Sequence, residues 1–246
     1  MCTVTFFPKD DHNWVLSTNR DELKSRDKAL PPSIFKAGEL NYLAPIDGKA
    51  GGTWVGMNEA GICLTLLNNY QGVNPLISHH TDALSRGLII PKLMHLTQLN
   101  EVDNKMKTLQ TANYNPFRLV GIQSKPWKLM EWSWDGMDFQ IHSHPVKPHL
   151  WVSAGRDYEG VWNSREKVFK NFLKANPLPD VAAIKRLHAS RYPDPGAYAF
   201  AMELDIVATV SNTIAELHGG KPRMHYHDGI PLKSGTWEVT DLTPYT

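Results

Sequence analysis

The sequence predicts an α+β fold in which residues 1–246 form a single domain. Predicted strands and helices follow one another in the order strands, helix, strands, helices, strands. Residues 62–67 are apolar on both faces, which is typical of a strand in a sheet that is covered on both sides. No linker, low-complexity tract or repeat divides the chain. Two antiparallel sheets packed together and covered by helices would produce this order, and so would a single α+β sheet.

The predicted strands of the first third alternate with turns. They are residues 3–7, 14–19, 51–57 (whose first residues form a turn) and 62–67. The first two are expected to pair as an antiparallel hairpin, because a short polar, turn-rich segment joins them. A polar segment with Pro31 and Pro32 follows the hairpin, and no strand is predicted there.

The remaining elements mix helices and strands. From Thr81 to Leu99 leucines recur at roughly helical intervals, with Pro91 as a break or kink. Further helices are expected at 103–109, 163–175 and 180–190. Further strands are expected at 117–122, 128–134, 137–142, 206–215 and 223–227. Asp135 and Gly136 are typical hairpin-turn residues.

The composition excludes several classes of function. Of the 246 residues 41% are apolar and 21% are charged, which is enough for a sizeable core. Lys and Arg number 26 against 25 acidic residues, so no excess positive charge indicates a nucleic-acid partner. Two cysteines cannot form a disulfide framework. Because there is neither a signal peptide nor an apolar run of about 18 residues, we expect a cytoplasmic protein without a membrane span.

Cys2 is the most suggestive residue for chemistry. If Met1 is removed, Cys2 carries a thiol and a free α-amine on the same carbon, and the amine, with a reference pKa of about 7.7–8.0, can act as a base. One residue could then supply both the nucleophile and the general base. The alternative is that Cys2 only begins an edge strand. Cys63 lies inside the apolar run 62–67, where a buried structural cysteine is expected.

A second cluster, Asn19-Arg20-Asp21-Glu22, follows the second predicted strand. It is either a solvated turn or a strand end that brings charged groups beside Cys2. In the hairpin, a carboxylate there would hold an ammonium group in place. A guanidinium there would lower the pKa of a thiol or bind an acidic substrate group.

Four segments together resemble the NRDE family, which is named after its Asn-Arg-Asp-Glu signature and includes the transport and Golgi organisation protein 2 relatives. They are Met1-Cys2-Thr3, Ser17-Thr18-Asn19-Arg20-Asp21-Glu22, Gly51-Gly52-Thr53-Trp54-Val55-Gly56 and Ser85-Arg86-Gly87. The resemblance covers most of the chain and is densest in the first ninety residues.

The resemblance implies a fold and an activity. The family is similar to the N-terminal-nucleophile hydrolases, which have a four-layer αββα sandwich of two antiparallel sheets. The mechanistic parallel is the cholylglycine hydrolase group of bile salt hydrolases and penicillin V acylases. Its Gly-Met-Asn-Glu-x-Gly motif matches residues 56–61 here, and Asn68 follows at the matching spacing. The similarity implies Cys2 as nucleophile, Asp21 as the carboxylate that orients the α-amine, and Asn68 as a donor to the oxyanion.

Together with Arg20 and Asn19 of the signature, these residues form the candidate catalytic site. The expected enzyme is an amidohydrolase that cleaves a non-peptide amide or related acyl bond through a Cys2 thioester, with no cofactor.

The sequence departs from the acylases at two places. Their Arg three residues before the Asp is Thr18 here, and an Arg instead directly precedes the Asp. Neighbouring side chains on a regular strand point to opposite faces, so Arg20 and Asp21 both face Cys2 only if the strand end is bulged. The later Asn of the acylases has no counterpart around residues 151–155, which leaves the second oxyanion donor unassigned.

Two other functions remain open. The same fold could be a carrier of heme or of an acyl or lipid ligand, roles proposed for relatives of the family, or an interaction protein without site chemistry. The histidine pairs His142/His144 and His225/His227 have the spacing of one strand face, but no further ligand completes a familiar metal site. We therefore expect solvated or core histidines and no metal. The sequence indicates no oligomeric state.

Overall fold

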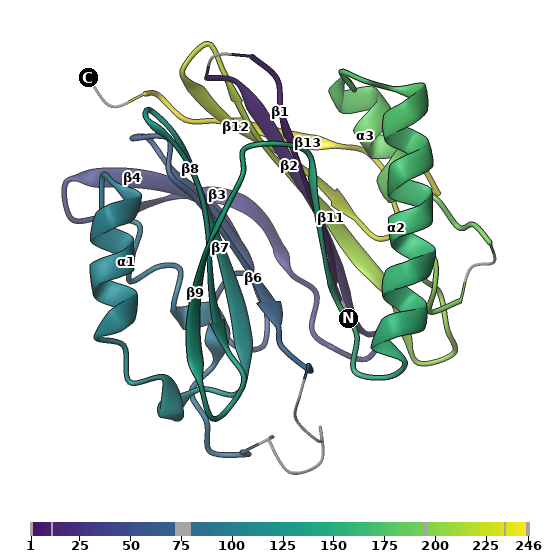
Figure 1. Cartoon of the computed structure of the whole chain (residues 1–246), viewed down its shortest axis with the longest axis horizontal. Helices are drawn as coiled ribbons and strands as arrows, with labels where there is room; N and C mark the ends of the chain where they lie inside the picture. Colours follow the sequence, from purple (N-terminus) through teal and green to yellow (C-terminus); the bar gives the residue numbers. More distant parts are fainter. Residues whose placement is uncertain (1, 11, 72–79, 194–195, 234, 245–246) are drawn as a thin grey trace.

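The computed structural model describes residues 2–10, 12–71, 80–193, 196–233 and 235–244, and within them two antiparallel sheets pack face to face (Figure 1). The first sheet has the order β10-β1-β2-β11-β12-β13 and the second β3-β4-β5-β6-β7-β8-β9. The strands of the first sheet are β1 (Cys2–Pro8), β2 (Trp14–Leu23), β10 (His149–Ser153), β11 (Val207–His218), β12 (Lys221–Asp228) and β13 (Glu238–Asp241). Those of the second are β3 (Leu30–Ala37), β4 (Leu40–Ile46), β5 (Val55–Asn58), β6 (Cys63–Asn68), β7 (Phe117–Ser124), β8 (Trp127–Trp134) and β9 (Phe139–His144).

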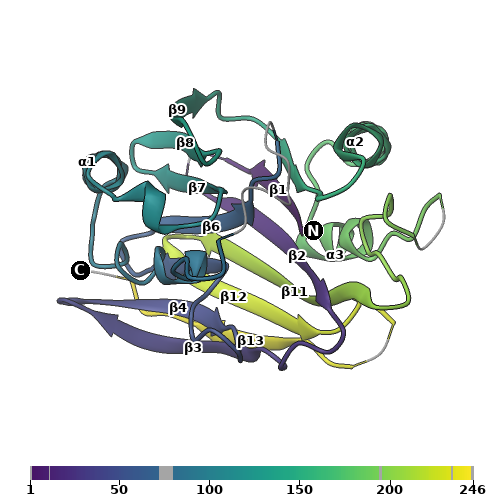
Figure 2. The same ribbon diagram turned by 90° about the horizontal axis from the view of Figure 1, so that it is seen from below.

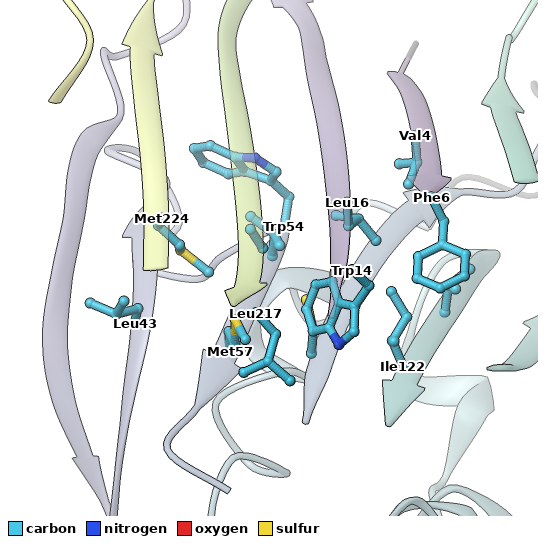
Figure 3. Packing of buried hydrophobic residues seen from close by; sticks show 14 of the residues in the cluster. Val4, Phe6, Trp14, Leu16, Leu43, Trp54, Met57, Ile122, Leu217 and Met224 are labelled. Atoms are coloured by element: carbon cyan, nitrogen blue, oxygen red, sulfur yellow. The ribbon is translucent and has the colours of Figure 1, made fainter. Parts of the chain in front are cut away.

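The main core lies between the two sheets. Because side chains alternate along a strand, every second residue of each central strand points into this layer. Figure 3 shows Phe6 and Leu16 of the first sheet in the same layer as Met57 and Ile122 of the second, and all four are buried. The predicted hairpin is confirmed, with β1 and β2 paired antiparallel from Cys2 opposite Arg20 to Pro8 opposite Trp14.

Helices cover both outer faces. Figures 1 and 2 show α2 (Tyr158–Ala175) and α3 (Val181–His188) on one side of the sheets and α1 (Leu99–Lys107) on the other. Apolar residues of α2 and α3, including Phe169 and Ile184, pack on the outer face of the first sheet. Residues of α1 and of the preceding segment, including Val102 and Ile90, cover the second sheet. The four-layer αββα sandwich is thus confirmed, and the single-sheet alternative is wrong.

Several element boundaries differ from the prediction. The segment from Thr81 to Leu99 is not a long helix, since it contains only a short 3-10 turn at Arg86–Leu88 and further turns. The helix expected at 103–109 begins at Leu99, where the Glu101 carboxylate accepts a hydrogen bond from the backbone N–H of Gln98 (2.9 Å). Strands β3, β4, β10 and β13 lie outside the predicted set. None of the helices in the described ranges is both long and apolar enough to span a membrane.

Candidate functional site

A small pocket of about 160 Å³ opens where β1, β2 and β6 approach one another. Four of the five predicted site residues line it, namely Cys2, Arg20, Asp21 and Asn68. The segments 52–54 and 85–87 also line it, together with Glu22, Arg26, Asp47 and Leu66. The two segments are parts of two motifs that the family resemblance had singled out without assigning them a role.

Cys2 is the first residue of β1 and lies opposite Arg20 on β2 and Ser153 on β10. Its side chain is partly buried and packs against the core between the sheets. Burial raises the pKa of the Cys2 thiol and the charge of Asp21 adds to this, whereas the charge of the chain's amino terminus, a backbone hydrogen bond from Asp21 and the charge of Arg20 lower it. The resting thiol is therefore mainly protonated, and attack on a carbonyl requires a base.

Cys63 has the environment that its apolar surroundings predict. It is fully buried in the core between the sheets, and burial raises its pKa. It does not line the pocket.

The signature residues on β2 alternate between its two faces. Arg20 lies on the same face as Cys2, with its guanidinium 4.9 Å from the centre of the Trp54 ring, and it forms an ion pair with Asp47. Arg26 donates two further hydrogen bonds of 2.9 Å to the Asp47 carboxylate. Because Asp47 pairs with both guanidiniums, much of their charge is already compensated.

The Asp21 carboxylate lies on the face toward the helices. It accepts a hydrogen bond from Thr209 (2.6 Å), and an Arg165 nitrogen is 3.7 Å away. Burial raises the pKa of Asp21, against the opposing effects of Arg165 and the Thr209 hydrogen bond. Cys2 pairs with Arg20, so Asp21 comes one step further along the antiparallel ladder, at the amino end of β1.

A bulge does occur at this point, but in the neighbouring strand. Asp21 pairs with Thr209 and Arg20 with Ser211, so the extra residue belongs to β11. β2 itself keeps its alternation, and Arg20 and Asp21 point to opposite faces.

The structure places Asn19 away from the pocket, beneath the helices. Its side-chain N–H groups donate to the carbonyls of His188 (2.9 Å) and Phe200 (2.8 Å), and its oxygen accepts from Asn212 (2.7 Å). These contacts hold the end of α3 on the sheet, so this position is structural.

Asn68 reaches the pocket from the last position of β6. Its side-chain amide has two N–H donors, and one of them bonds to the Tyr70 hydroxyl (2.8 Å). The backbone carbonyl of Asn68 accepts a hydrogen bond from the Ser153 hydroxyl (2.8 Å), which joins β6 of one sheet to β10 of the other. Ser153 lies opposite Cys2 in the sheet. The bond therefore connects the strand pair that carries Cys2 to Asn68, the candidate oxyanion donor.

The two motif segments in the pocket wall are packed backbone to backbone. The Thr53 N–H donates to the Gly87 carbonyl (3.0 Å), and a Cβ on Gly52 would come within 2.5 Å of the Gly87 carbonyl carbon. This contact positions Arg86 in the wall. No local sequence pattern indicates a site role for Arg86 or Asp47, and the one signal for Arg86 is its place in the Ser-Arg-Gly segment.

One histidine of each predicted pair contacts a carboxylate. His144 bonds to Glu131 (2.9 Å) and His225 to Glu216 (3.1 Å). Within the described ranges, no group of three or more His, Cys, Asp or Glu side chains has the geometry to hold a metal ion.

Comparisons with known proteins give a family and a fold. A family model described as Transport and Golgi organisation 2 matches residues 1–147. The structure is similar to a Caenorhabditis elegans ortholog of N-acylethanolamine-hydrolyzing acid amidase, with a TM-score of 0.62 and 14% identity over 87% of this chain and 92% of that chain. Two variants of conjugated bile acid hydrolase from Clostridium perfringens match with TM-scores of 0.58 and 0.59 and identities of 12% and 11%, over 98% of this chain and 92% of theirs. At these identities the structural matches show a shared fold. A comparison with curated sequences gave no significant match.

Proposed function

This chain belongs to the Transport and Golgi organisation 2 family and has the fold of amide-cleaving N-terminal-nucleophile hydrolases, and we propose that it is itself a cysteine hydrolase of this type. Its substrate would contain a non-peptide amide or a related acyl bond. The observation that carries the proposal is the convergence of Cys2, Asp21 and Asn68 on one pocket. These residues come from three different strands, and each has the chemistry that one step of amide cleavage needs.

The proposed reaction begins after Met1 is removed. The Cys2 α-amine takes the proton of its own thiol, whose raised pKa makes such a base necessary. Asp21, at the amino end of β1, holds the resulting ammonium in place. The thiolate attacks the substrate carbonyl, and the second N–H of Asn68 donates to the oxyanion that forms.

Collapse of this intermediate gives the products. The C–N bond breaks, the Cys2 ammonium protonates the leaving nitrogen, and the acyl group stays on sulfur as a thioester. Water then attacks the thioester, with the amine as base, and releases the carboxylic acid and the free thiol. We expect Asn68→Ala to lower kcat by roughly 10²–10³, the usual cost of losing one oxyanion donor.

The first experiment is mass spectrometry of the native protein after brief treatment with iodoacetamide. Met1 should be absent, and Cys2 should be alkylated long before the buried Cys63. A panel of chromogenic amides should then form an acyl-enzyme that Cys2→Ala cannot form and that Cys63→Ala, the matched control, still forms. Quantitative retention of Met1 in active protein, or full turnover by Cys2→Ala, would exclude the mechanism.

A carrier of heme or of an acyl or lipid ligand is the alternative. The pocket at Cys2, about 160 Å³, is by itself smaller than the roughly 300–1,000 Å³ usual for sites that enclose a drug-sized ligand. A second pocket of about 370 Å³ shares Arg20 and Arg26 with it and has the volume that a carrier would need. A Soret band on heme titration that persists in Cys2→Ala, without acyl-enzyme formation, would favour the carrier.

A further inference from the structure

Among the residues that the structure describes, Arg86 differs from the other arginines around the site in forming no ion pair with a carboxylate. The paired arginines each form an ion pair with a carboxylate. The pairs are Arg20 with Asp47, Arg26 with Asp47, Arg118 with Glu131 and Arg165 with Asp21. Arg86 donates one hydrogen bond to the backbone carbonyl of Pro116 (2.9 Å), and within the described residues it forms no ion pair.

The surroundings of Arg86 make this lack of a partner costly. Arg86 is half-buried, and burial lowers the pKa of its guanidinium, which means that the charge has lost part of its hydration. A guanidinium has five N–H donors in a planar fork, and the Pro116 carbonyl accepts from one of its nitrogens. Such a group gains most from an oxyanion, which it can bind through two parallel hydrogen bonds.

The carboxylates of the pocket do not meet this need. Asp47 is shared by Arg20 and Arg26, and Glu22 lies 3.6 Å from Arg26. Asp21 faces Arg165 on the other side of the sheet. Three guanidiniums and three carboxylates line the pocket, but Asp21 is also engaged by Arg165, so Arg86 is the guanidinium of the pocket without an ion pair of its own among the described residues.

Arg86 and Cys2 face the same small space. Both line the pocket, and the charges of Tyr70 and of a Cys2 thiolate partly oppose the lowering of the Arg86 pKa by burial. The close packing of Gly52 on Gly87 fixes the backbone next to Arg86. A ligand group at the guanidinium would therefore lie beside the bond that Cys2 attacks.

We propose that Arg86 binds an oxyanion of the substrate, so that the preferred substrates are acyl compounds with a carboxylate or similar anionic group close to the scissile bond. This inference rests on the proposed function in one respect, namely that the bound anion belongs to a substrate. The anion-binding role of Arg86 itself can be tested without turnover.

The test compares the rates at which Cys2 is alkylated by iodoacetate, which is anionic, and by iodoacetamide, its neutral isostere. The ratio of the two rates cancels the fraction of thiolate, so it reports binding of the carboxylate alone. We expect the iodoacetate-to-iodoacetamide rate ratio to fall at least about fivefold in Arg86→Gln, because this variant loses a charge-assisted hydrogen bond to the carboxylate. Arg86→Lys keeps the positive charge and should largely keep the ratio. Arg186→Gln removes an exposed arginine of α3 and should leave the ratio unchanged.

Two further measurements complete the test. Acetate, methyl phosphate and methanesulfonate should each be tried as protectants of wild-type Cys2 against iodoacetamide, and the strongest protectant identifies the kind of oxyanion. An unchanged ratio in folded Arg86→Gln would overturn the proposal. If Arg86→Gln does not fold, failure of all three anions to protect Cys2 would overturn it.

Turnover separates this proposal from the proposed function. The experiment compares two acylated aminonitrobenzenes, one with a carboxylate on the ring and the other with a carboxamide at the same position. The substrate with the carboxylate should have the higher kcat/KM. Cleavage of both at equal kcat/KM, with no preference for iodoacetate, contradicts the anion site alone. Absence of any amide cleavage, with the iodoacetate preference intact, contradicts the hydrolase and supports the anion site.

Discussion

The alternation of side chains along β2 gives neighbouring signature residues different tasks. Arg20 faces the pocket, whereas Asn19 and Asp21 face the helices and contact His188 and Arg165. His188 is fully buried, and its ring is held at both nitrogens. Nε2 lies 2.7 Å from the Thr5 hydroxyl oxygen and Nδ1 lies 3.1 Å from the Asn19 side-chain oxygen. An amide oxygen only accepts, so Nδ1 carries a proton, and in the neutral ring Nε2 then accepts from Thr5.

The neutral state of His188 predicts a loss of stability in acid. Burial, with the nearby Arg165 charge, lowers the pKa of His188 from 6.5 to about 3, so between these values the unfolded chain binds one proton more than the folded chain. The free energy of unfolding should therefore fall with decreasing pH across this window, by at most about 1.4 kcal/mol per pH unit from this group. Urea unfolding from pH 7 to pH 4.5 measures the slope.

His188→Gln should be less stable at pH 7 but should show a flatter dependence on pH. His95→Gln, at an exposed position, controls for the loss of an imidazole. Equal slopes for wild type and His188→Gln would show that another group causes the acid sensitivity.

At the scale of elements, tertiary contacts override two local patterns. The leucines between Thr81 and Leu99 have helical spacing, but the Asn58 side chain donates to the carbonyls of Met94 (3.0 Å) and Leu96 (2.8 Å), which ties this backbone to the sheet instead of to a helix. Strand β3 contains Pro31 and Pro32, which it tolerates because it is the edge strand and its register shifts between Leu30 and Ser33.

The difference between local patterns and tertiary contacts also explains which residues of the candidate site the sequence could predict. The placement of Cys2, Asp21 and Asn68 around one pocket was predictable, because each belongs to a motif that carries the family resemblance. Arg86 and Asp47 take their roles from partners far away in the chain, such as Pro116 and Arg20. No periodicity of the sequence encodes such contacts.

The contact between the segments around Gly52 and Gly87 gives a prediction at this scale. A Cβ at position 52 would lie 2.5 Å from the Gly87 carbonyl carbon and 2.7 Å from its oxygen, so the backbone must shift. Gly52→Ala should lower the free energy of unfolding by about 1–3 kcal/mol, which is usual for overpacking. It should also move Arg86 and so reduce the preference of Cys2 for iodoacetate.

Gly155→Ala is the matched control, because its new Cβ would meet only ordinary contacts with Tyr70 at 3.8 Å. Its free energy of unfolding should change by less than about 1 kcal/mol. If Gly52→Ala were as stable as this control, the two segments would not be locked together as the structure indicates.

At the scale of the whole molecule, the apolar layer between the sheets includes a buried polar connection. Glu131 of β8 accepts hydrogen bonds from Arg118 (2.6 Å) within its own sheet and from the indole N–H of Trp151 (2.9 Å) on β10 of the other sheet. Arg118 also donates to the Val152 carbonyl of β10 (3.4 Å). Since β10 pairs with β1, this connection helps to hold the strand that begins with Cys2 against the other sheet.

The charge of Glu131 therefore contributes to holding the two sheets together, and the contribution depends on pH. Hydrogen bonds from His144, Arg118 and Trp151, with the Arg118 charge, outweigh burial and lower the pKa of Glu131 from 4.5 to about 2. The stabilisation is complete above pH 4.5 and is lost as the pH falls toward 2, because the carboxylate is then protonated in both states. Glu131→Gln should cost roughly 3 kcal/mol at pH 7, as for a buried ion pair that loses one partner.

That cost should shrink as the pH falls from 4.5 toward 2, which urea titrations of wild type and variant across this range would measure. Glu166→Gln removes a carboxylate from a surface pair with Lys170 and should cost less than about 1 kcal/mol at every pH. A cost for Glu131→Gln that stayed constant with pH would mean that packing, and not the charge, holds the sheets together here. A decreasing cost, together with faster alkylation of Cys2 in the variant, would show that this connection also supports the pocket.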